Sequence, residues 1–306
     1  YGVGLLLFSI FLPEGLAGLM SKLEERFQPR KAPRPLGNAS SARGGAASET
    51  RVQGMALEVR EIGKDFGGVR ALDGVSLSVK PGSIHAIVGP NGSGKTTLLN
   101  VISGFYPADG GSVTLGGATL TGLSPTRVAR LGVQRTFQTP KLLADLTVLE
   151  NTRFGAYARE QASGVEIALA LPRARQECAR LDAEALKLLE VVGLAHRAHE
   201  KAGELPHGQQ RLVELARAMI GHPRMLLLDE PAAGLSMGEL EEFGKLMLEM
   251  RRLGMTLVMV EHHIELVADI ADSVTVLDQG RTLAEGTPEQ VFQSAAVVNA
   301  YTGAAR

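Results

Sequence analysis

The chain has 306 residues, and 44% of them are hydrophobic, which is enough to bury the core of one large domain or of two modest ones. Its 32 Lys and Arg residues nearly balance its 33 Asp and Glu residues, and the formal charge of -1 argues against wholesale binding of nucleic acid. The single cysteine, Cys178, excludes an intrachain disulfide and fits a reducing compartment.

The amino end is apolar and begins with Tyr rather than Met, so we expect a piece of a longer chain. Residues 1–13 are uncharged, but a membrane-spanning helix needs about 20 apolar residues, so this run suffices for only part of one. No basic residue precedes it, unlike in a secretory signal, and the basic residues that follow favour the cytoplasmic side. We expect residues 1–27 to be the end of a membrane helix and its tail; an ordinary buried helix at a domain start is the alternative.

Residues 28–54 are rich in Pro, Gly, Ser, Ala and Arg and have almost no apolar periodicity. Such a segment cannot bury enough surface to offset the entropy lost on ordering, so we expect a flexible linker. The main domain is then expected over residues 55–306.

A glycine-rich loop lies between a predicted buried strand at 84–88 and the apolar start of a helix at 98–102. It matches G-x-x-x-x-G-K-[ST] in the strand-to-helix context that this phosphate-binding motif requires. Its glycines let main-chain amides approach phosphate, Lys95 adds a positive charge, and the Thr96 hydroxyl can bind Mg²⁺. A glycine-rich turn without a ligand is the alternative. The candidate nucleotide-binding residues are Gly89, Pro90, Asn91, Gly92, Ser93, Gly94, Lys95, Thr96 and Thr97.

Two carboxylates follow the continuous apolar run at 225–228, which predicts a central parallel strand. In α/β sheets, ligands bind at the carboxyl ends of such strands. We expect Asp229 to hold the Mg²⁺ shell and Glu230 to act as general base toward the attacking water. An acidic helix cap is the alternative.

Two further polar side chains follow predicted strands. The strand at 256–260 precedes His262, which we predict to sense the γ-phosphate in preference to His263; a histidine that only caps the next helix is the alternative. The strand at 133–137 precedes Gln138, whose amide is expected to reach both Mg²⁺ and the water, unless it is a plain polar loop residue. Glu230, His262 and Gln138 are thus the candidate catalytic residues, and Thr96, Gln138 and Asp229 the candidate metal ligands.

The segment Leu205–Arg211, LPHGQQR, precedes a helix whose Leu212, Leu215, Ala216 and Met219 share one face. P-loop proteins in general do not need this segment, and with it the chain resembles the nucleotide-binding domain of ABC transporters over about residues 55–293. The resemblance implies an α/β P-loop NTPase fold with a RecA-like core, an antiparallel β subdomain and a helical subdomain at about 140–222. The apolar stripe of that subdomain (Leu181, Ala185, Leu188, Leu189 and Val192) is expected to be core rather than a docking surface.

In that family two domains close head to tail over two ATP molecules, which implies that Gly208 and Gln209 act on the nucleotide of the second domain. The resemblance also implies that Phe66 stacks on adenine, with a core phenylalanine as the alternative. Two positions depart from the family pattern: Pro206 stands where Ser is usual, and Ser236 where Asp is usual. Both changes bear on coupling between the domains more than on ATP binding.

Further stretches, among them Arg135-Thr136-Phe137-Gln138 and Glu230-Pro231-Ala232-Ala233-Gly234, are similar to the ATPases of branched-chain amino acid importers. Residues 11–19 are similar to the carboxyl end of the permease of the same importers. The resemblance implies a permease fused to the ATPase, at the cytoplasmic face of the inner membrane, with 28–54 as a tether. A second ATP-binding domain, further permease subunits and an external solute-binding protein would be its partners.

Other functions stay open from the sequence. Related importers of urea or other amides share these motifs. An ABC ATPase acting on DNA or the ribosome usually carries two ATPase domains or a long coiled coil, and neither is evident here. A RecA-like enzyme acting on a small substrate is disfavoured by the segment at 205–211.

Overall fold

The computed structural model describes residues 52–159, 166, 169 and 171–302. These belong to a compact unit that covers Glu49–Arg306. The expected membrane-helix remnant, and the expected linker up to residue 51, lie outside the described residues, so both stay predictions. At its described end, the main-chain amides of Val52 and Gly54 donate to the carbonyls of Leu253 and Gly254. Within the described ranges, no helix combines the length and apolar character that crossing a membrane requires.

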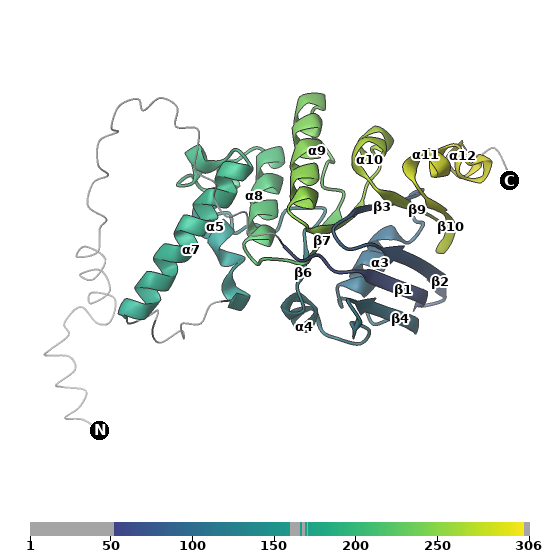
Figure 1. Ribbon diagram of the computed structural model, residues 1–306, viewed down its shortest axis with the longest axis horizontal. Helices are drawn as coiled ribbons and strands as arrows, with labels where there is room; N and C mark the ends of the chain where they lie inside the picture. The colour runs from purple at the N-terminus through teal and green to yellow at the C-terminus, as the bar shows by residue number, and fades with distance from the viewer. Residues whose placement is uncertain (1–51, 160–165, 167–168, 170, 303–306) are drawn as a thin grey trace, which may run out of the picture. The chain divides into compact units, whose positions relative to one another are not determined.

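The larger sheet has six strands in the order β10-β9-β3-β8-β7-β6 (Figure 1). Five strands run parallel, and β10 pairs antiparallel with β9 at one edge. The carboxyl ends of β3, β7 and β8 therefore meet at the same edge of the sheet. The strands are β3 (Ile84–Val88), β6 (Val133–Arg135), β7 (Met225–Asp229), β8 (Thr256–Val260), β9 (Ser273–Asp278) and β10 (Arg281–Gly286).

The smaller sheet has four antiparallel strands in the order β2-β1-β4-β5. They are β1 (Leu57–Phe66), β2 (Val69–Val79), β4 (Gly110–Leu115) and β5 (Ala118–Thr119). The β1–β2 hairpin closes with Phe66 opposite Val69, and its two turn glycines have positive φ angles, which glycine adopts without strain. This sheet is the antiparallel β subdomain that the sequence led us to expect.

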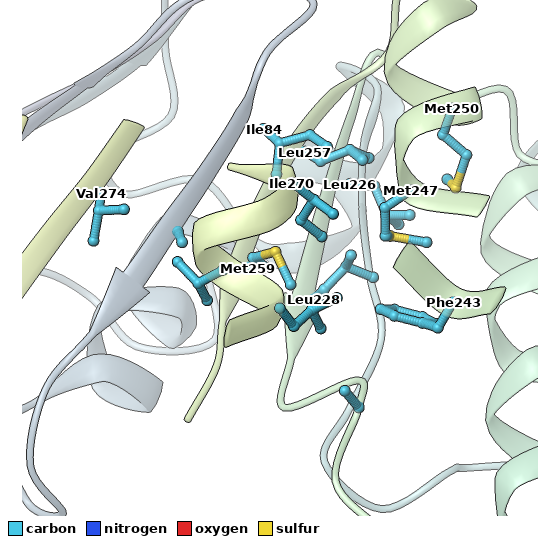
Figure 2. Close-up of a cluster of buried hydrophobic side chains, with 14 of the residues drawn as sticks. Ile84, Leu226, Leu228, Phe243, Met247, Met250, Leu257, Met259, Ile270 and Val274 are labelled. Carbon is cyan, nitrogen blue, oxygen red and sulfur yellow. The ribbon is translucent and has the colours of Figure 1, made fainter. Parts of the chain in front are cut away.

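Alternate side chains of the parallel strands fill two separate cores, because successive residues of a strand point to opposite faces of the sheet. Leu226 and Leu228 belong to the core that β7 shares with the helices on one face, whereas Met225 and Leu227 belong to the core on the other face. Figure 2 shows the first core, with Phe243 and Met247 of a covering helix packed against the strands. Asp229, two residues beyond Leu227, shares the face of the second core, which also contains the helix that follows the glycine-rich loop.

Helices cover both faces of the large sheet and form a separate layer beside β6 (Figure 1). In that layer α5, α7 and α8 pack together around two small cores, and the predicted stripe on α7 lies there. Leu181, Ala185, Leu189 and Val192 are buried, and Leu188 is half-buried against the same cores, so the prediction that the stripe forms core is confirmed. The helices are α3 (Lys95–Ile102), α4 (Pro125–Arg130), α5 (Val148–Phe154), α7 (Pro172–Val191), α8 (His207–Met219), α9 (Met237–Arg252), α10 (Ile264–Ile270), α11 (Pro288–Phe292) and α12 (Ala295–Thr302), with short 3₁₀ turns at Tyr157–Arg159, Ala195–Arg197 and Ala202–Glu204.

One predicted strand is shorter than expected. The strand expected over 133–137 ends at Arg135, where its ladder with β7 stops at the pair Arg135 and Leu227. Thr136 donates one more main-chain hydrogen bond to Leu227, of 2.9 Å, and the chain then leaves the sheet. Gln138 therefore lies in a loop and not at the end of the strand.

A buried histidine in β3 predicts a loss of stability in mild acid. His85 is fully buried between the hydroxyls of Ser273 (Nδ1 to Oγ, 2.7 Å) and Thr275 (Nε2 to Oγ1, 2.9 Å), and burial lowers its pKa to about 4. The unfolded chain takes up this proton near pH 6.5 and the folded chain only near pH 4, so stability is lost as pH falls through that window. At pH 5.0 we expect this group to cost about 2 kcal/mol relative to pH 7.5.

Urea unfolding of the wild type and of His85→Gln at both pH values would measure this cost. The variant should lose less stability than the wild type on acidification, whereas replacing the exposed His199 by Gln should leave the wild-type pH dependence unchanged. An equal loss in the wild type and in His85→Gln would contradict this assignment.

Candidate active site

The glycine-rich loop connects β3 to α3 at the carboxyl edge of the parallel sheet. The ammonium group of Lys95 turns back into the loop and donates to the carbonyls of Gly89 (2.9 Å) and Pro90 (2.8 Å). Lys95 is buried, and desolvation lowers its pKa, while the nearby carboxylates of Glu230 and Asp229 act in the opposite direction. The loop thus holds a positive charge that, in the described part of the chain, is hydrogen-bonded to main-chain oxygens and is close to two acidic side chains.

Two glycines of this loop cannot be replaced without moving the main chain. Gly89 and Gly94 have φ angles of 149° and 102°, which other residues rarely adopt. A Cβ on Gly89 would lie 2.0 Å from the carbonyl oxygen of Leu277, and one on Gly94 would lie 2.6 Å from that of Ala71. The loop therefore packs directly against neighbouring main chain, and its turn depends on the absence of side chains at these positions.

At the end of β7, Asp229 forms a buried ion pair that the sequence did not reveal. Its Oδ2 accepts from Nη2 of Arg135 at 2.8 Å, and both side chains are about 95% buried (6% and 4% exposed). Nη1 of the same arginine donates to Asn100 Oδ1 (2.7 Å) and to Ser103 Oγ (2.9 Å) on and just after α3. Arg135 therefore connects β6, β7 and α3 behind the glycine-rich loop.

Glu230, the next residue, is held between the other two predicted catalytic residues. Its Oε1 lies 2.9 Å from Nε2 of His262, and its Oε2 accepts from Nε2 of Gln138 at 3.0 Å. Glu230 itself has a φ angle of 50°, an uncommon conformation for a residue with a side chain. The structure thus brings together three side chains from the ends of β7 and β8 and from the loop after β6. It also places His262, rather than His263, against the carboxylate.

Helix α8 secures this arrangement from one side. Arg211 donates through Nη1 to the carbonyl of Glu230 (2.6 Å) and through Nη2 to that of Gln138 (3.2 Å). Six residues further along α8, Arg217 donates to the carbonyl of Lys141 and forms an ion pair with Glu214 (3.3 Å). Burial raises the pKa of Glu214 and lowers the pKa of Arg217. The loop that carries Gln138 is therefore fixed to α8, which begins at His207 within the segment 205–211 and not after it.

The remaining predicted residues lie around this centre. Phe66 is 41% exposed at the end of β1 and outside the core clusters, and its ring packs edge-on against Tyr106 at 5.2 Å. Gly208 and Gln209 lie in the first turn of α8, where Pro206 provides no side-chain cap and Gln209 accepts a hydrogen bond from Arg197. Contacts of these residues with adenine or with the nucleotide of a second domain stay predictions.

Ser236, which replaces the Asp usual in the family, caps α9. Its hydroxyl accepts from the amide of Glu239 (3.4 Å), and the Glu239 carboxylate accepts from the amide of Ser236 (2.8 Å). This reciprocal pair is a capping box, which stabilises the start of a helix. Ser236 therefore has a structural role in this chain.

The donors and acceptors of the site fit a triphosphate and a divalent metal ion. Asp229 Oδ1 is buried and has no hydrogen-bond partner among the described residues, as expected of an oxygen that serves a metal ion or its waters. Ser93 Oγ in the glycine-rich loop is likewise buried and unpartnered within the described part of the chain. With the Lys95 ammonium and the amino end of α3, these groups offer positive charge to phosphate and oxygen to Mg²⁺.

The buried ion pair predicts a large stability effect. In Arg135→Met the Asp229 carboxylate would remain buried without a cation, and breaking a buried pair in this way costs about 3–5 kcal/mol. Adding Asp229→Asn should restore part of that loss, since no uncompensated charge remains. Denaturant unfolding would measure both.

The exposed pair between Lys245 and Glu241 on α9 provides the control: Lys245→Met should leave stability close to that of the wild type, because water screens an exposed ion pair. An Arg135→Met variant as stable as the wild type would contradict the structural role of this arginine.

The fold and the site define a P-loop ATPase with an antiparallel β subdomain and a helical subdomain. The family model described as ABC transporter matches residues 72–233. The chain is 40% identical to LivG, a high-affinity branched-chain amino acid transport ATP-binding protein of Salmonella typhimurium, over 253 residues, which cover 81% of this chain and 98% of LivG. It is 38% identical to BraF, the protein of the same description from Pseudomonas aeruginosa, with the same coverage of both chains.

Solved structures agree with these relatives. The crystal structure of a nucleotide-free ATP-binding cassette from an ABC transporter superposes with a TM-score of 0.71 at 36% identity, over 81% of this chain and 98% of that chain. The chain belongs to the ATP-binding proteins of ABC transporters, and its enzymatic activity is ATP hydrolysis coupled to transport. The predicted α/β fold with three subdomains is confirmed.

Proposed function

We propose that this ATPase powers the import of branched-chain amino acids. The observation that carries the proposal is the match to LivG and BraF, whose names state that transport function and which this chain matches over 98% of their length. Import of another solute, such as urea, by the same type of ATPase is the alternative.

In the proposed site, the residues of the glycine-rich loop bind the phosphates of ATP. The amides at 92–97 and the amino end of α3 face the phosphates, and Lys95 exchanges its bonds to Gly89 and Pro90 for bonds to the β- and γ-phosphates. Thr96, Asp229 and Gln138 would hold Mg²⁺, which neutralises charge on the phosphates when bound. Phe66 covers the adenine from the β1–β2 turn.

Glu230 orients the attacking water and accepts its proton. Its carboxylate is the acceptor for Gln138 and the neighbour of His262, so both of its oxygens have defined positions before a substrate is bound. His262 and Gln138 would then contact the γ-phosphate side of the site. A general base placed in this way contributes typically 10²–10⁴-fold to a rate.

Two copies of the domain, or this domain and a second one, would close head to tail with Gly208 and Gln209 over the partner's nucleotide. A dimeric structure of an ATP-binding cassette bound to ADP and phosphate supports the pairing of two such domains; it superposes with a TM-score of 0.65 at 26% identity, over 76% of this chain and 98% of that chain. Membrane permease subunits would be the next partners, at the cytoplasmic face of the inner membrane.

We further propose that residues 1–27 are the carboxyl end of a fused permease and that residues 28–54 tether the ATPase to it. Such a tether raises the local concentration of the ATPase beside its permease.

Reconstitution of the natural full-length polypeptide in proteoliposomes, with its permease partners and solute-binding protein, tests the solute. We expect ATP-dependent uptake of labelled leucine that unlabelled isoleucine and valine inhibit. Uptake of labelled urea without uptake of leucine would overturn the proposal and favour the alternative.

The fusion has a separate test. An antibody raised against residues 55–306 should detect, in native membranes, a polypeptide larger than the 32.4 kDa of this chain that alkaline carbonate does not extract. A species of about the size of this chain that carbonate releases would contradict the fusion and leave the ATPase function in place.

A further inference from the structure

Glu261, between β8 and His262, has no role in the reaction described above. Its side chain is buried, with 1% of the residue exposed. Its Oε1 accepts from the main-chain amide of Ala232 at 2.7 Å. Its Oε2 accepts from the amides of His262 (3.0 Å) and His263 (3.5 Å). Among the described residues, its side chain therefore accepts hydrogen bonds from main-chain N–H groups, and these bonds join two loops that are distant in sequence.

The two loops leave the sheet at adjacent points. Strands β7 and β8 are paired up to Asp229 and Val260, and the amide of Glu230 donates to the carbonyl of Val260 at 2.9 Å. Beyond this bond the two main chains are no longer paired: one continues to Ala232 and the other to His262. The Glu261 carboxylate accepts from an amide in each of these two segments and so links them beyond the end of the strands.

The Glu261 carboxylate completes a closed ring of contacts that passes through Glu230 and His262. From the Glu230 carboxylate, the ring passes to the His262 imidazole, from the His262 amide to the Glu261 carboxylate, and from there to the Ala232 amide, two residues from Glu230. A shift of the His262 main chain away from the loop of Ala232 would break the bond from the His262 amide and leave Oε2 of the buried Glu261 carboxylate with the longer bond from the His263 amide, which is unfavourable for a buried charge.

We propose that Glu261 is a positioning residue: it fixes the main chain of His262 against the loop of Ala232 and thereby sets the geometry between His262 and Glu230. The inference rests on the proposed roles of those two residues in hydrolysis. Glu261 acts through main-chain amides and does not contact the substrate itself.

The isosteric variant Glu261→Gln tests this proposal. Its side-chain amide retains one acceptor oxygen and puts an NH₂ group in place of the other, so one of the two loops loses its acceptor. We expect kcat for ATP hydrolysis to fall at least 10-fold, while the KM for ATP and the affinity for a fluorescent ATP analogue stay within twofold of the wild type. The analogue binding also reports that the variant is folded.

A double variant separates positioning from general loss of structure. If Glu261 acts through His262, then Glu261→Gln should reduce kcat less than twofold further in a His262→Ala background. A kcat in the double variant that is lowered by the product of the two single-variant factors would overturn the proposal. A wild-type kcat in Glu261→Gln would overturn it too. Glu265→Gln, an exposed carboxylate change one helical turn further on, should behave as wild type.

The two proposals fail in different ways. Wild-type turnover in His262→Ala itself would remove the role assigned to His262, and the positioning proposal with it. A large loss in His262→Ala together with wild-type turnover in Glu261→Gln would overturn only the positioning proposal.

Discussion

Glu230→Gln should lower kcat for ATP hydrolysis by about 10²–10⁴-fold, the range that a positioned general base contributes. The substitution keeps the size of the side chain and its neighbours Gln138 and His262, but it removes the charge that accepts the proton of the water. ATP affinity should stay the same or rise slightly, because one negative charge near the triphosphate is lost. Steady-state turnover and equilibrium binding of ATP with Mg²⁺ would measure the two effects.

The matched control for this prediction is Glu242→Gln, an exposed carboxylate of α9 that should leave both quantities unchanged. Loss of ATP affinity in parallel with kcat in Glu230→Gln would show that the carboxylate supports binding and does not act as a base. Unchanged turnover would exclude Glu230 as the base altogether.

Lys95→Met is expected to remove most of the ATP affinity without destabilising the domain. A hydrogen bond to a charged group contributes about 1.5–3 kcal/mol, so loss of the ammonium should weaken binding at least roughly 10- to 100-fold. Stability should not fall much, because burial already disfavours the charged ammonium and lowers its pKa. Titration with ATP and thermal unfolding of the free protein would separate the two effects.

Lys187→Met on α7 serves as the control, since this lysine is exposed and is expected to affect neither quantity. ATP binding that survives in Lys95→Met would show that the main-chain amides suffice without the ammonium. A large drop in the melting temperature of the protein without ATP would instead indicate that Lys95 has a structural role in the loop.

The fold was predictable where one local pattern fixes one element. The apolar runs at 84–88, 225–228 and 256–260 coincide with β3, with the start of β7 and with β8, because a strand buried on both faces needs apolar residues throughout. The run at 133–137 was misleading, because periodicity does not show where a chain leaves its neighbour. Strand β6 ends at Arg135, whose side chain turns to Asp229.

The site was predictable to the extent that its residues follow strands in the order their chemistry requires. That rule predicts Lys95, Glu230, His262 and Gln138 at one edge of the sheet. In the structure Glu230 contacts Gln138 and His262, and its charge acts on Lys95. Arg135 and Arg211 were missed, although each lies within a segment quoted from the sequence, and so was Glu261, which lies between the strand at 256–260 and His262. Their partners are 94, 19 or 29 residues away along the chain, so spacing gives no indication of the contacts.

The departures Pro206 and Ser236 have different structural consequences. Ser236 retains the helix-capping function at the start of α9, because its hydroxyl and the Glu239 carboxylate form the reciprocal bonds of a capping box. Pro206 stands at the start of α8 and does not cap its first-turn amides with a side chain. An anion such as the phosphate of a nucleotide on a second domain would satisfy such donors.

The most direct measurement is the binding of ATP to the purified protein at increasing Mg²⁺, with Lys95→Met in parallel. The proposed site requires saturable ATP binding that strengthens with Mg²⁺ in the wild type and is largely lost in the variant. An ATP affinity that does not depend on Mg²⁺ and is equal in both proteins would show that the loop at 89–97 and the carboxylate of Asp229 do not form the nucleotide site.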